Sequence, residues 1–407
     1  MEMMNDLETA RSFDLWGGLW LLSMAASRGT VVARPRLPIF LNMYCILVGE
    51  SGWPRKSTAV KHALRVARRF IDEYDRETIL VTDATTPQKL ILELVTQSKT
   101  FEKATAVIAI SELVRFLGRD AASVDMPGLL TDLYDCPEIA ESPGTIARGA
   151  TVIRNAYLTF LSASTPAWLA RGVNQEAISG GFTSRILFIV AMEGKNRIPW
   201  PKDETKFDTD KLVGWLHRIR RFSNSDCKGI ITLESDTLKA FSEWYTTRTL
   251  HRDDFRASFE SREDEHILRI GALLSLNEKR SSISLTNFCI AQSLVELAKQ
   301  RATEIFDVGV SYDKTTLGIE AVLSALSTTS RGEGIKQGDL AKQVRHRCNS
   351  SDLTAILDVL QHLSAVRKYR AKPAKGGRPY ILWIPTEELT FVDGREVLRL
   401  LPEFIQR

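Results

Sequence analysis

The stretch GESGWPRKST, Gly49–Thr58, directly follows the apolar run YCILV of Tyr44–Val48. A strand-like run that ends in a glycine-containing loop and continues into Lys-Ser-Thr and a helical pattern predicts a phosphate-binding loop. In such a loop the backbone N–H groups point at phosphate oxygens, Lys56 reaches the β- and γ-phosphates, and Ser57 holds Mg²⁺. The predicted nucleotide contacts are Gly49, Glu50, Ser51, Gly52, Trp53, Pro54, Arg55, Lys56, Ser57 and Thr58.

The spacing of this loop departs from the standard pattern G-x-x-x-x-G-K-[ST]. Here six residues separate Gly49 from Lys56, and Arg55 stands where the second glycine belongs. The alternative interpretation is a glycine-rich turn that merely precedes a helix. The sequence also leaves two roles open for Arg55: a charge at the nucleotide, or a contact with an adjoining subunit.

The composition is that of a folded protein without an overall basic field. The chain has 407 residues, 44% hydrophobic and 26% charged, and a net charge of +4, so any DNA contact must come from local clusters. Its five cysteines lie far apart, which argues against structural zinc or a disulfide framework and fits a reducing cytoplasm. The most apolar stretch, Phe13–Ala26, is too short to span a membrane, and we expect a buried helix over Leu7–Ser27.

Short apolar runs alternate with helical patterns in the first half of the chain, which predicts parallel strands covered on both faces. The expected fold class is α/β, with a three-layer α/β/α P-loop core whose ligand lies at the carboxyl ends of the strands. The predicted strands are Tyr44–Val48, Thr78–Thr82, Ala106–Ile110, Tyr157–Ser162 and Ile186–Val190.

The rest of the chain divides into a helical region and a small terminal module. The signal is helical from Thr209 to about Val308. Three helices followed by two strands, Val366–Ala371 and Arg378–Ile384, then predict a winged helix. The predicted domains are residues 1–200 for the P-loop core with its N-terminal helix, 201–310 for a helical lid, 316–387 for the winged helix, and 388–407 for a C-terminal tail.

Basic residues on the predicted wing favour DNA binding, with the third helix in a groove and the wing on the backbone. The predicted DNA contacts in this module are Arg367, Lys368 and Lys375. The alternatives are a winged helix that binds protein, or a basic face that is only solvated.

Three further residues at strand ends are candidates for what a P-loop hydrolase needs beyond its phosphate loop. Glu112 follows the run AVIAIS of Ala106–Ser111 and is placed to orient the attacking water; otherwise it only caps a helix. Ser164 or one of its neighbours in LTFLSASTP, Leu158–Pro166, is a candidate γ-phosphate sensor, or it caps the helix that begins at Pro166. Arg185 is a candidate arginine finger toward a neighbouring subunit, or it forms a structural salt bridge.

The order of loop, Ser-Glu strand, hairpin, sensor strand and Ser-Arg strand resembles that of AAA+ ATPases. Residues 5–305 resemble in particular the helicase-like P-loop ATPases of phages, plasmids and integrated elements, the "domain of unknown function 3987" group, whose loops read G-x-x-G followed by R-K-S-T. The stretch TIARGATVIRNA, Thr145–Ala156, is similar to the pore hairpin of minichromosome maintenance helicases, which implies that Arg148 faces DNA. Two departures, Ser111 in place of the usual aspartate and a missing sensor asparagine, concern the rate of hydrolysis more than binding.

The resemblance implies an Mg²⁺-dependent ATPase that assembles into a ring, a hexamer, and acts as a DNA helicase in replication of a mobile element or phage. Single-stranded DNA would pass through the pore, duplex DNA would contact the winged helix, and a primase or another replication protein would be a partner. The alternative is a slow, nucleotide-switched DNA-binding ATPase of transposition or defence. In the lid, Arg262 is interpreted as paired within its helix or as a second sensor, and His266 as a packed core residue.

Overall fold

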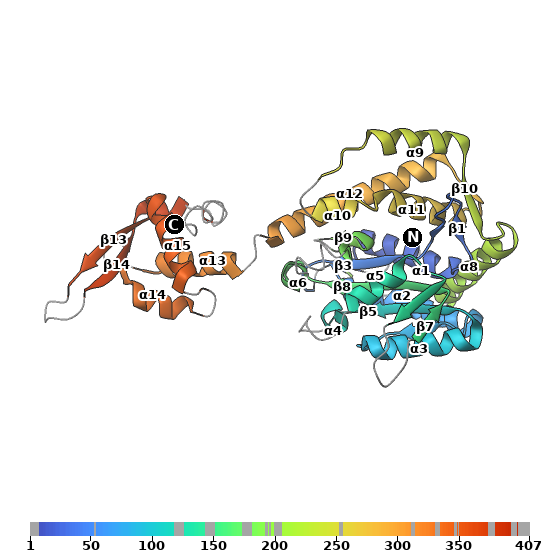
Figure 1. Ribbon diagram of the computed structural model, residues 1–407, viewed down its shortest axis with the longest axis horizontal. Helices are drawn as coiled ribbons and strands as arrows, with labels where there is room; N and C mark the ends of the chain where they lie inside the picture. Colours follow the sequence, from blue (N-terminus) through green and yellow to red (C-terminus); the bar gives the residue numbers. More distant parts are fainter. Residues whose placement is uncertain are drawn as a thin grey trace. The chain divides into compact units, whose positions relative to one another are not determined.

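The structure is a computed structural model that describes residues 8–52, 54–117, 126–142, 151–172, 181–191, 194, 197–198, 206–251, 255–310, 314–329, 334–345, 348, 350–372, 379–391 and 397. The chain divides into two compact units, Met1–Ile305 and Phe306–Arg407. Figure 1 labels most of the elements of both units. By this division the predicted core, residues 1–200, and nearly all of the predicted lid, residues 201–310, belong to the same unit.

Five parallel strands form the central sheet of the first unit, in the order β4-β5-β8-β3-β9. Their bounds are Tyr44–Val48 (β3), Ile79–Val81 (β4), Ala104–Ile110 (β5), Ala156–Ser164 (β8) and Leu187–Val190 (β9). Every residue of β3, β8 and β9 is buried, as expected for strands covered on both faces. The five predicted strands are therefore confirmed, with small shifts at their ends.

Helices cover both faces of this sheet, an arrangement compatible with a three-layer α/β/α core. On β8, Tyr157 donates a hydrogen bond of 2.6 Å to the carbonyl of Ser23 in α1 (Arg11–Ala26). Phe160 lies three positions further along and so on the opposite face, where it stacks on Phe116 of α4 (Leu113–Leu117) with 5.4 Å between ring centroids. Most of α1 is buried, which confirms the predicted N-terminal core helix.

Further helices and two smaller sheets complete the described part of this unit. The helices are α2 (Lys56–Tyr74), α3 (Pro87–Phe101), α5 (Met126–Tyr134), α6 (Pro166–Gly172), α8 (Lys206–Ser225), α9 (Ser235–Thr247), α10 (Phe255–Glu260), α11 (Glu263–Asn277) and α12 (Leu285–Val310), the last of which runs across the boundary between the units. The smaller sheets are β11-β10-β1-β2, of Val31–Val32 (β1), Ile39–Phe40 (β2), Ile230–Leu233 (β10) and Ser282–Ile283 (β11), and the antiparallel pair β6 (Ile139–Ser142) and β7 (Thr151–Arg154).

Strands β10 and β11 correct the expectation of an entirely helical region from Thr209 to Val308. Both are too short to show an alternating apolar pattern, and they form because β10 pairs with β1 and β11 pairs with β10. The antiparallel pair β6–β7 flanks the predicted hairpin residue Arg148, which lies outside the described residues, as do Trp53 and Lys375.

The second unit has its own apolar core around Trp383, which is fully buried against residues such as Ile356, Leu360 and Val366. Its sheet has the order β12-β14-β13, so it contains one strand more than the two expected. The elements are α13 (Lys314–Ser327), β12 (Ile335–Lys336), α14 (Gln337–Val344), α15 (Ser350–His362), β13 (Val366–Ala371), β14 (Tyr380–Pro385) and the 3-10 helix η3 (Glu387–Phe391).

Candidate functional site

A cavity of about 370 Å³ lies at the carboxyl ends of β3, β5 and β8. Because β3 and β5 both pair in parallel with β8, the carboxyl ends of the three strands lie at one edge of the sheet, and the segments that follow them begin there. Of the predicted site residues, Ser51, Gly52, Lys56, Ser57, Glu112 and Ser164 line this cavity. The other lining residues are Ser111, Leu113, Val114, Ala163, Thr165 and Trp168.

The two glycines of the loop meet different backbone requirements. A Cβ on Gly49 would lie 2.6 Å from the carbonyl oxygen of Ala191, which is closer than real Cβ contacts come. Gly52 has a φ of +94°, in the region that favours glycine. Arg55, at the position before α2, has a left-handed backbone with φ 54° and ψ 34°. This conformation turns the chain from the loop into the helix.

The side chain of Arg55 contacts Glu8 and is not among the residues that line the cavity. Arg55 Nη2 lies 2.6 Å from Glu8 Oε2, and Glu8 Oε1 accepts a hydrogen bond of 2.8 Å from the Ile198 N–H. The Ile198 N–H and then the Arg55 guanidinium lower the pKa of the Glu8 carboxyl. In the single chain, Arg55 therefore ties the loop to the residue positions before α1, a role that the loop sequence did not indicate.

Lys56 is the first residue of α2, and its Nζ donates a hydrogen bond of 3.2 Å to the backbone oxygen of Glu50. Burial lowers the pKa of Lys56, and the charges of Glu50 and Glu112 only partly oppose this effect. Lys56 itself begins a 19-residue helix, whose N-terminal end carries a partial positive charge. A partly desolvated cation at a helix N-terminus is suited to anionic oxygens.

Hydrogen bonds connect the start of α2 and the ends of β3, β5 and β8. Ser57 Oγ donates a long hydrogen bond of 3.4 Å to the backbone oxygen of Ser111. Ser162 Oγ donates to Ile110 O at 2.8 Å, and the Gly49 N–H donates to Ser164 O at 3.2 Å. The Ser57 hydroxyl oxygen keeps its acceptor capacity in this arrangement, as a ligand to a metal ion requires.

At the end of β8, the helix cap and the candidate γ-phosphate sensor are two different residues. Thr165 Oγ1 accepts a hydrogen bond of 3.3 Å from the Trp168 N–H, so Thr165 caps α6. Ser164 instead lines the cavity, and its Oγ donates to Thr165 O at 3.4 Å. Glu112 also lines the cavity and directly precedes α4, a position compatible with either of its predicted roles. Thr165 lies within the stretch Leu158–Pro166 for which the sequence indicated a sensor or a helix cap, and a threonine before a proline at the first helical position is a known cap signal.

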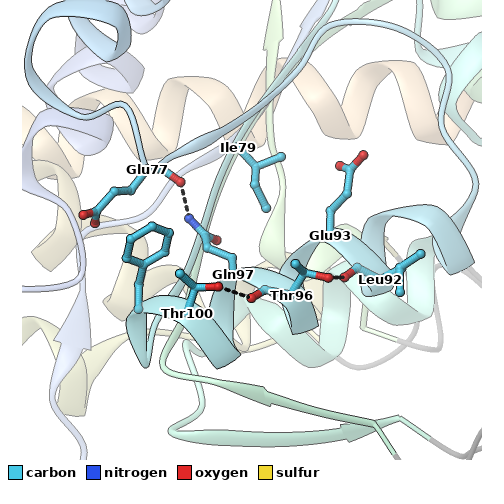
Figure 2. A pocket seen from close by; sticks show the side chains of 8 residues that line it. Glu77, Ile79, Leu92, Glu93, Thr96, Gln97 and Thr100 are labelled. Atoms are coloured by element: carbon cyan, nitrogen blue, oxygen red, sulfur yellow. Dashed lines mark hydrogen bonds between the residues drawn. The ribbon is translucent and has the colours of Figure 1, made fainter.

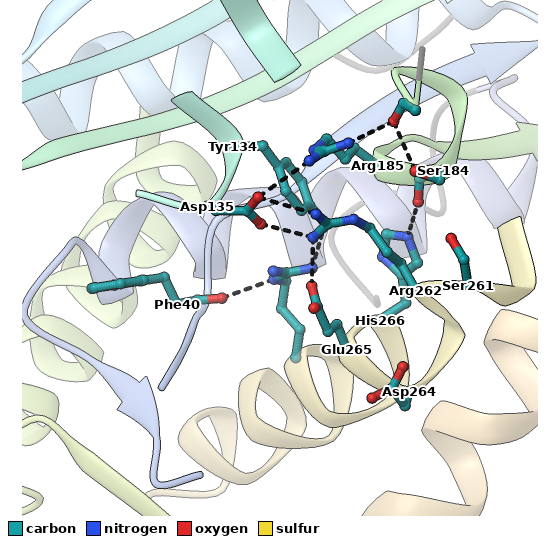
Figure 3. A network of polar contacts seen from close by, with 12 residues as sticks. Phe40, Tyr134, Asp135, Ser184, Arg185, Ser261, Arg262, Asp264, Glu265 and His266 are labelled. Carbon is teal, nitrogen blue, oxygen red and sulfur yellow. Dashed lines mark hydrogen bonds and ion pairs between the residues drawn. The ribbon is translucent and has the colours of Figure 1, made fainter. Parts of the chain in front are cut away.

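Arg185 ends the 3-10 helix η2 (Thr183–Arg185) and is not among the residues that line the cavity. Its Nη2 lies 3.2 Å from Asp135 Oδ2, so the salt bridge that was one of its two interpretations is present. Arg262 contacts the same carboxylate (Figure 3). His266 is buried and its Nε2 lies 2.9 Å from Ser184 O, which confirms the predicted core histidine.

A second hollow, of about 400 Å³, lies beside the edge strand β4 and is less suited to a nucleotide (Figure 2). Its described lining contains two carboxylates, Glu77 and Glu93, and no lysine or arginine. The exposed apolar side chains of Leu92 and Phe101 account for much of its wall. An acidic, apolar hollow repels phosphate, so the cavity at the strand ends is the stronger candidate.

The predicted DNA contacts of the second unit lie on β13. Arg367 is exposed, and Lys368 pairs with Asp358 of α15 at 3.7 Å while its Nζ lies 5.1 Å from the centroid of the Trp383 ring. Arg367 therefore has the freer side chain of the two for a phosphate contact.

No model of a protein family and no curated protein sequence matches this chain. Among the described residues, no helix is both long and apolar enough to cross a bilayer. Within the same part of the chain, no group of three or more His, Cys, Asp or Glu side chains is arranged to hold a metal ion.

Proposed function

We propose that this chain is an Mg²⁺-dependent P-loop ATPase of the AAA+ type that acts on DNA. One observation carries the proposal: Lys56, Ser57, Glu112 and Ser164, which come from three separate segments of the sequence, line a single cavity at the strand ends. The cavity volume of about 370 Å³ falls within the range of about 300–1,000 Å³ that is usual for small-molecule sites.

Each of these side chains has a chemical role in the proposed reaction. The loop N–H groups and Lys56 hold the phosphates, and the Ser57 hydroxyl together with phosphate oxygens holds Mg²⁺. When bound, Mg²⁺ neutralises charge that develops on the transferred phosphoryl group. Glu112 orients the attacking water, and Ser164 donates a hydrogen bond toward the γ-phosphate.

The wider proposal follows the resemblance stated for the sequence. Residues 1–200 act as the P-loop core, 201–310 as the helical lid and 316–387 as a winged helix. The chains form a ring, a hexamer, in which Arg185 reaches the neighbour's nucleotide and Arg148 contacts a threaded DNA strand. Arg367, Lys368 and Lys375 contact duplex DNA, and the protein works as a helicase in the cytoplasm, with a primase among its partners.

A second candidate function is a slow ATPase that uses nucleotide as a switch for DNA binding. The observation in its favour is that Glu112 is the only carboxylate among the described residues that line the cavity, because Ser111 stands where an aspartate is usual. One carboxylate fewer near the metal is expected to slow hydrolysis more than nucleotide binding.

The test is ATP hydrolysis by the full chain, with and without single-stranded and duplex DNA. Lys56→Ala is expected to abolish turnover, because it removes the cation at the phosphates. Lys61→Ala, an exposed lysine on the same helix, is the matched control and should retain turnover. Undiminished hydrolysis by Lys56→Ala would overturn the proposal. DNA-stimulated hydrolysis with strand displacement selects the helicase, and ATP-dependent DNA binding without unwinding selects the switch.

A further inference from the structure

The outer face of the small sheet in the second unit combines aromatic and basic side chains. Successive residues of a strand point to opposite faces of a sheet, so the register decides which side chains share a face. Trp383 of β14 lies in the buried core, and its strand partners Ile335 and Lys368 therefore belong to the inner face. The alternate positions share the outer face: Lys336 of β12, Arg367, Tyr369 and Ala371 of β13, and Tyr380, Leu382 and Ile384 of β14.

The helices of the second unit pack on the inner face of this sheet, and its outer face stays accessible within the described part of the unit. Tyr369 is 47% exposed, a large fraction for an aromatic side chain. Tyr380, Leu382 and Ile384 are half-buried, and none of them is among the residues of the core around Trp383. The β13–β14 hairpin also extends beyond α14 and α15 (Figure 1). Apolar and aromatic groups on this face therefore lack the cover that the inner face has.

The charged groups on this outer face are cations. Lys336 and Arg367 are both exposed, and they lie on the two strands that flank β14. Lys336 Nζ lies 4.7 Å from the centroid of the Tyr380 ring, so an ammonium group and an aromatic ring adjoin. The described outer-face positions of β12, β13 and β14 include neither aspartate nor glutamate, and Asp358 pairs with Lys368 on the inner side. Such a face is complementary to a polyanion.

We propose that this outer face binds single-stranded DNA, with the Tyr369 ring stacked on a base and with Lys336 and Arg367 on phosphates. Aromatic side chains on a sheet stack on unpaired bases, and neighbouring cations hold the backbone. Tyr369 and Tyr380 are diagonal neighbours, about 7–8 Å apart in a regular sheet, so one strand can cross both rings. The bases of a duplex stack on one another and are closed to such a surface. This inference rests on the DNA binding of the proposed function and is independent of ATP hydrolysis.

The test is binding of the full chain to a fluorescein-labelled oligothymidylate and to a blunt duplex, measured by anisotropy. Tyr369→Ala is expected to weaken single-strand binding about 5- to 150-fold, the usual effect of losing one base stack, and duplex binding less than about twofold. Tyr369→Phe keeps the ring and should bind like the wild type. The matched control is Tyr245→Ala on α9, which removes a tyrosine of similar exposure, 42%, outside this face.

Photocrosslinking locates the contact independently of affinity. An oligonucleotide that carries iodouracil should crosslink to the wild-type peptide that contains Tyr369, as identified by mass spectrometry. Thermal unfolding of each variant checks that the change has not unfolded the chain.

The outcomes separate this inference from the proposed function. A wild-type chain that binds neither form of DNA would sink the proposed action on DNA. DNA binding by the wild type together with unchanged single-strand binding by Tyr369→Ala would overturn the inference alone. An equal loss of single-strand and duplex binding would also overturn it, because the ring would then not stack on a base. If Tyr369→Ala changed only the self-association of the chain in sedimentation, the face would bind a second copy and the inference would fail.

Discussion

Gly49 and Gly52 both lie in the loop between β3 and α2, but the structure requires glycine at the two positions for different reasons. Gly49 lets β3 pass close to the backbone of Ala191 and to the ring of Pro54, where an added Cβ would lie 2.6 and 2.7 Å from the nearest atoms. Gly52 supplies a positive φ with open space around it. The loop motif predicts the need for a positive φ, as at Gly52, but it does not predict the close approach to Ala191 and Pro54 that requires glycine at position 49.

Gly49→Ala is expected to lower the free energy of unfolding by about 1–3 kcal/mol, as overpacking does, and to weaken nucleotide binding. The matched control is Gly18→Ala, in α1, where a Cβ meets no atom within 4 Å. That change should stabilise the protein by about 0.4–1 kcal/mol, since alanine restricts the unfolded chain. Denaturant unfolding measures both effects, and equal stability of the two variants would contradict the crowding argument.

His266 is expected to make the protein sensitive to acid. Burial lowers the pKa of His266 from 6.5 to about 3, and the charge of Arg269 acts in the same direction. As the pH falls, the unfolded chain therefore binds the proton first, so this contribution to stability is complete above pH 6.5 and is lost between pH 6.5 and 3.

The variant His266→Gln keeps an N–H donor for Ser184 O and removes the titration. Within that pH range, its unfolding free energy should change less steeply than that of the wild type, by up to about 1.4 kcal/mol per pH unit. Denaturant unfolding at a series of pH values measures the slopes. Parallel curves for the two proteins would show that the imidazole is not the group responsible.

At the scale of elements, length and burial decided which strands were predictable. Strands β3 and β8 are continuous apolar runs because they are buried on both faces, and the sequence shows them directly. Strands β10, β11 and β12 are two to four residues long and have no periodic signal. Their strand conformation depends on partners that are distant in the chain, such as β14 for β12.

The exposed face of β13 supports a prediction for DNA binding. Arg367→Ala is expected to weaken duplex binding and to reduce the slope of log K against log salt by about 1, as the loss of one phosphate contact does. Lys368→Ala should have a smaller effect, because Asp358 already pairs with Lys368. Fluorescence anisotropy at several salt concentrations measures both, with Lys239→Ala on α9 as an exposed control. An unchanged slope for Arg367→Ala would remove β13 from the DNA-binding surface.

At the scale of the whole molecule, the division into two units predicts independent folding. Residues 8–310 and 314–407, produced separately, should each unfold cooperatively, because the second unit has its own buried core around Trp383. Trp383→Ala should lower the stability of the second piece by about 3–5 kcal/mol, the usual cost of truncating a buried aromatic side chain, and leave the first piece unchanged. Calorimetry measures both. A second piece that remained unfolded alone would contradict this division.

The sequence by itself determined the α/β class, the five parallel strands, the core helix α1 and six of the residues that line the cavity at the ends of β3, β5 and β8, namely Ser51, Gly52, Lys56, Ser57, Glu112 and Ser164. These features are local: each depends on a short apolar run or on the residues that end it. Only the tertiary structure decided that Thr165 and not Ser164 caps α6, that Arg55 binds Glu8, and that Arg185 and Arg262 share Asp135. The ion pairs join residues that are far apart in the chain, and the cap is formed by one of two adjacent hydroxyl residues. No local pattern of residue types determines which of these groups the folded chain brings within hydrogen-bond distance.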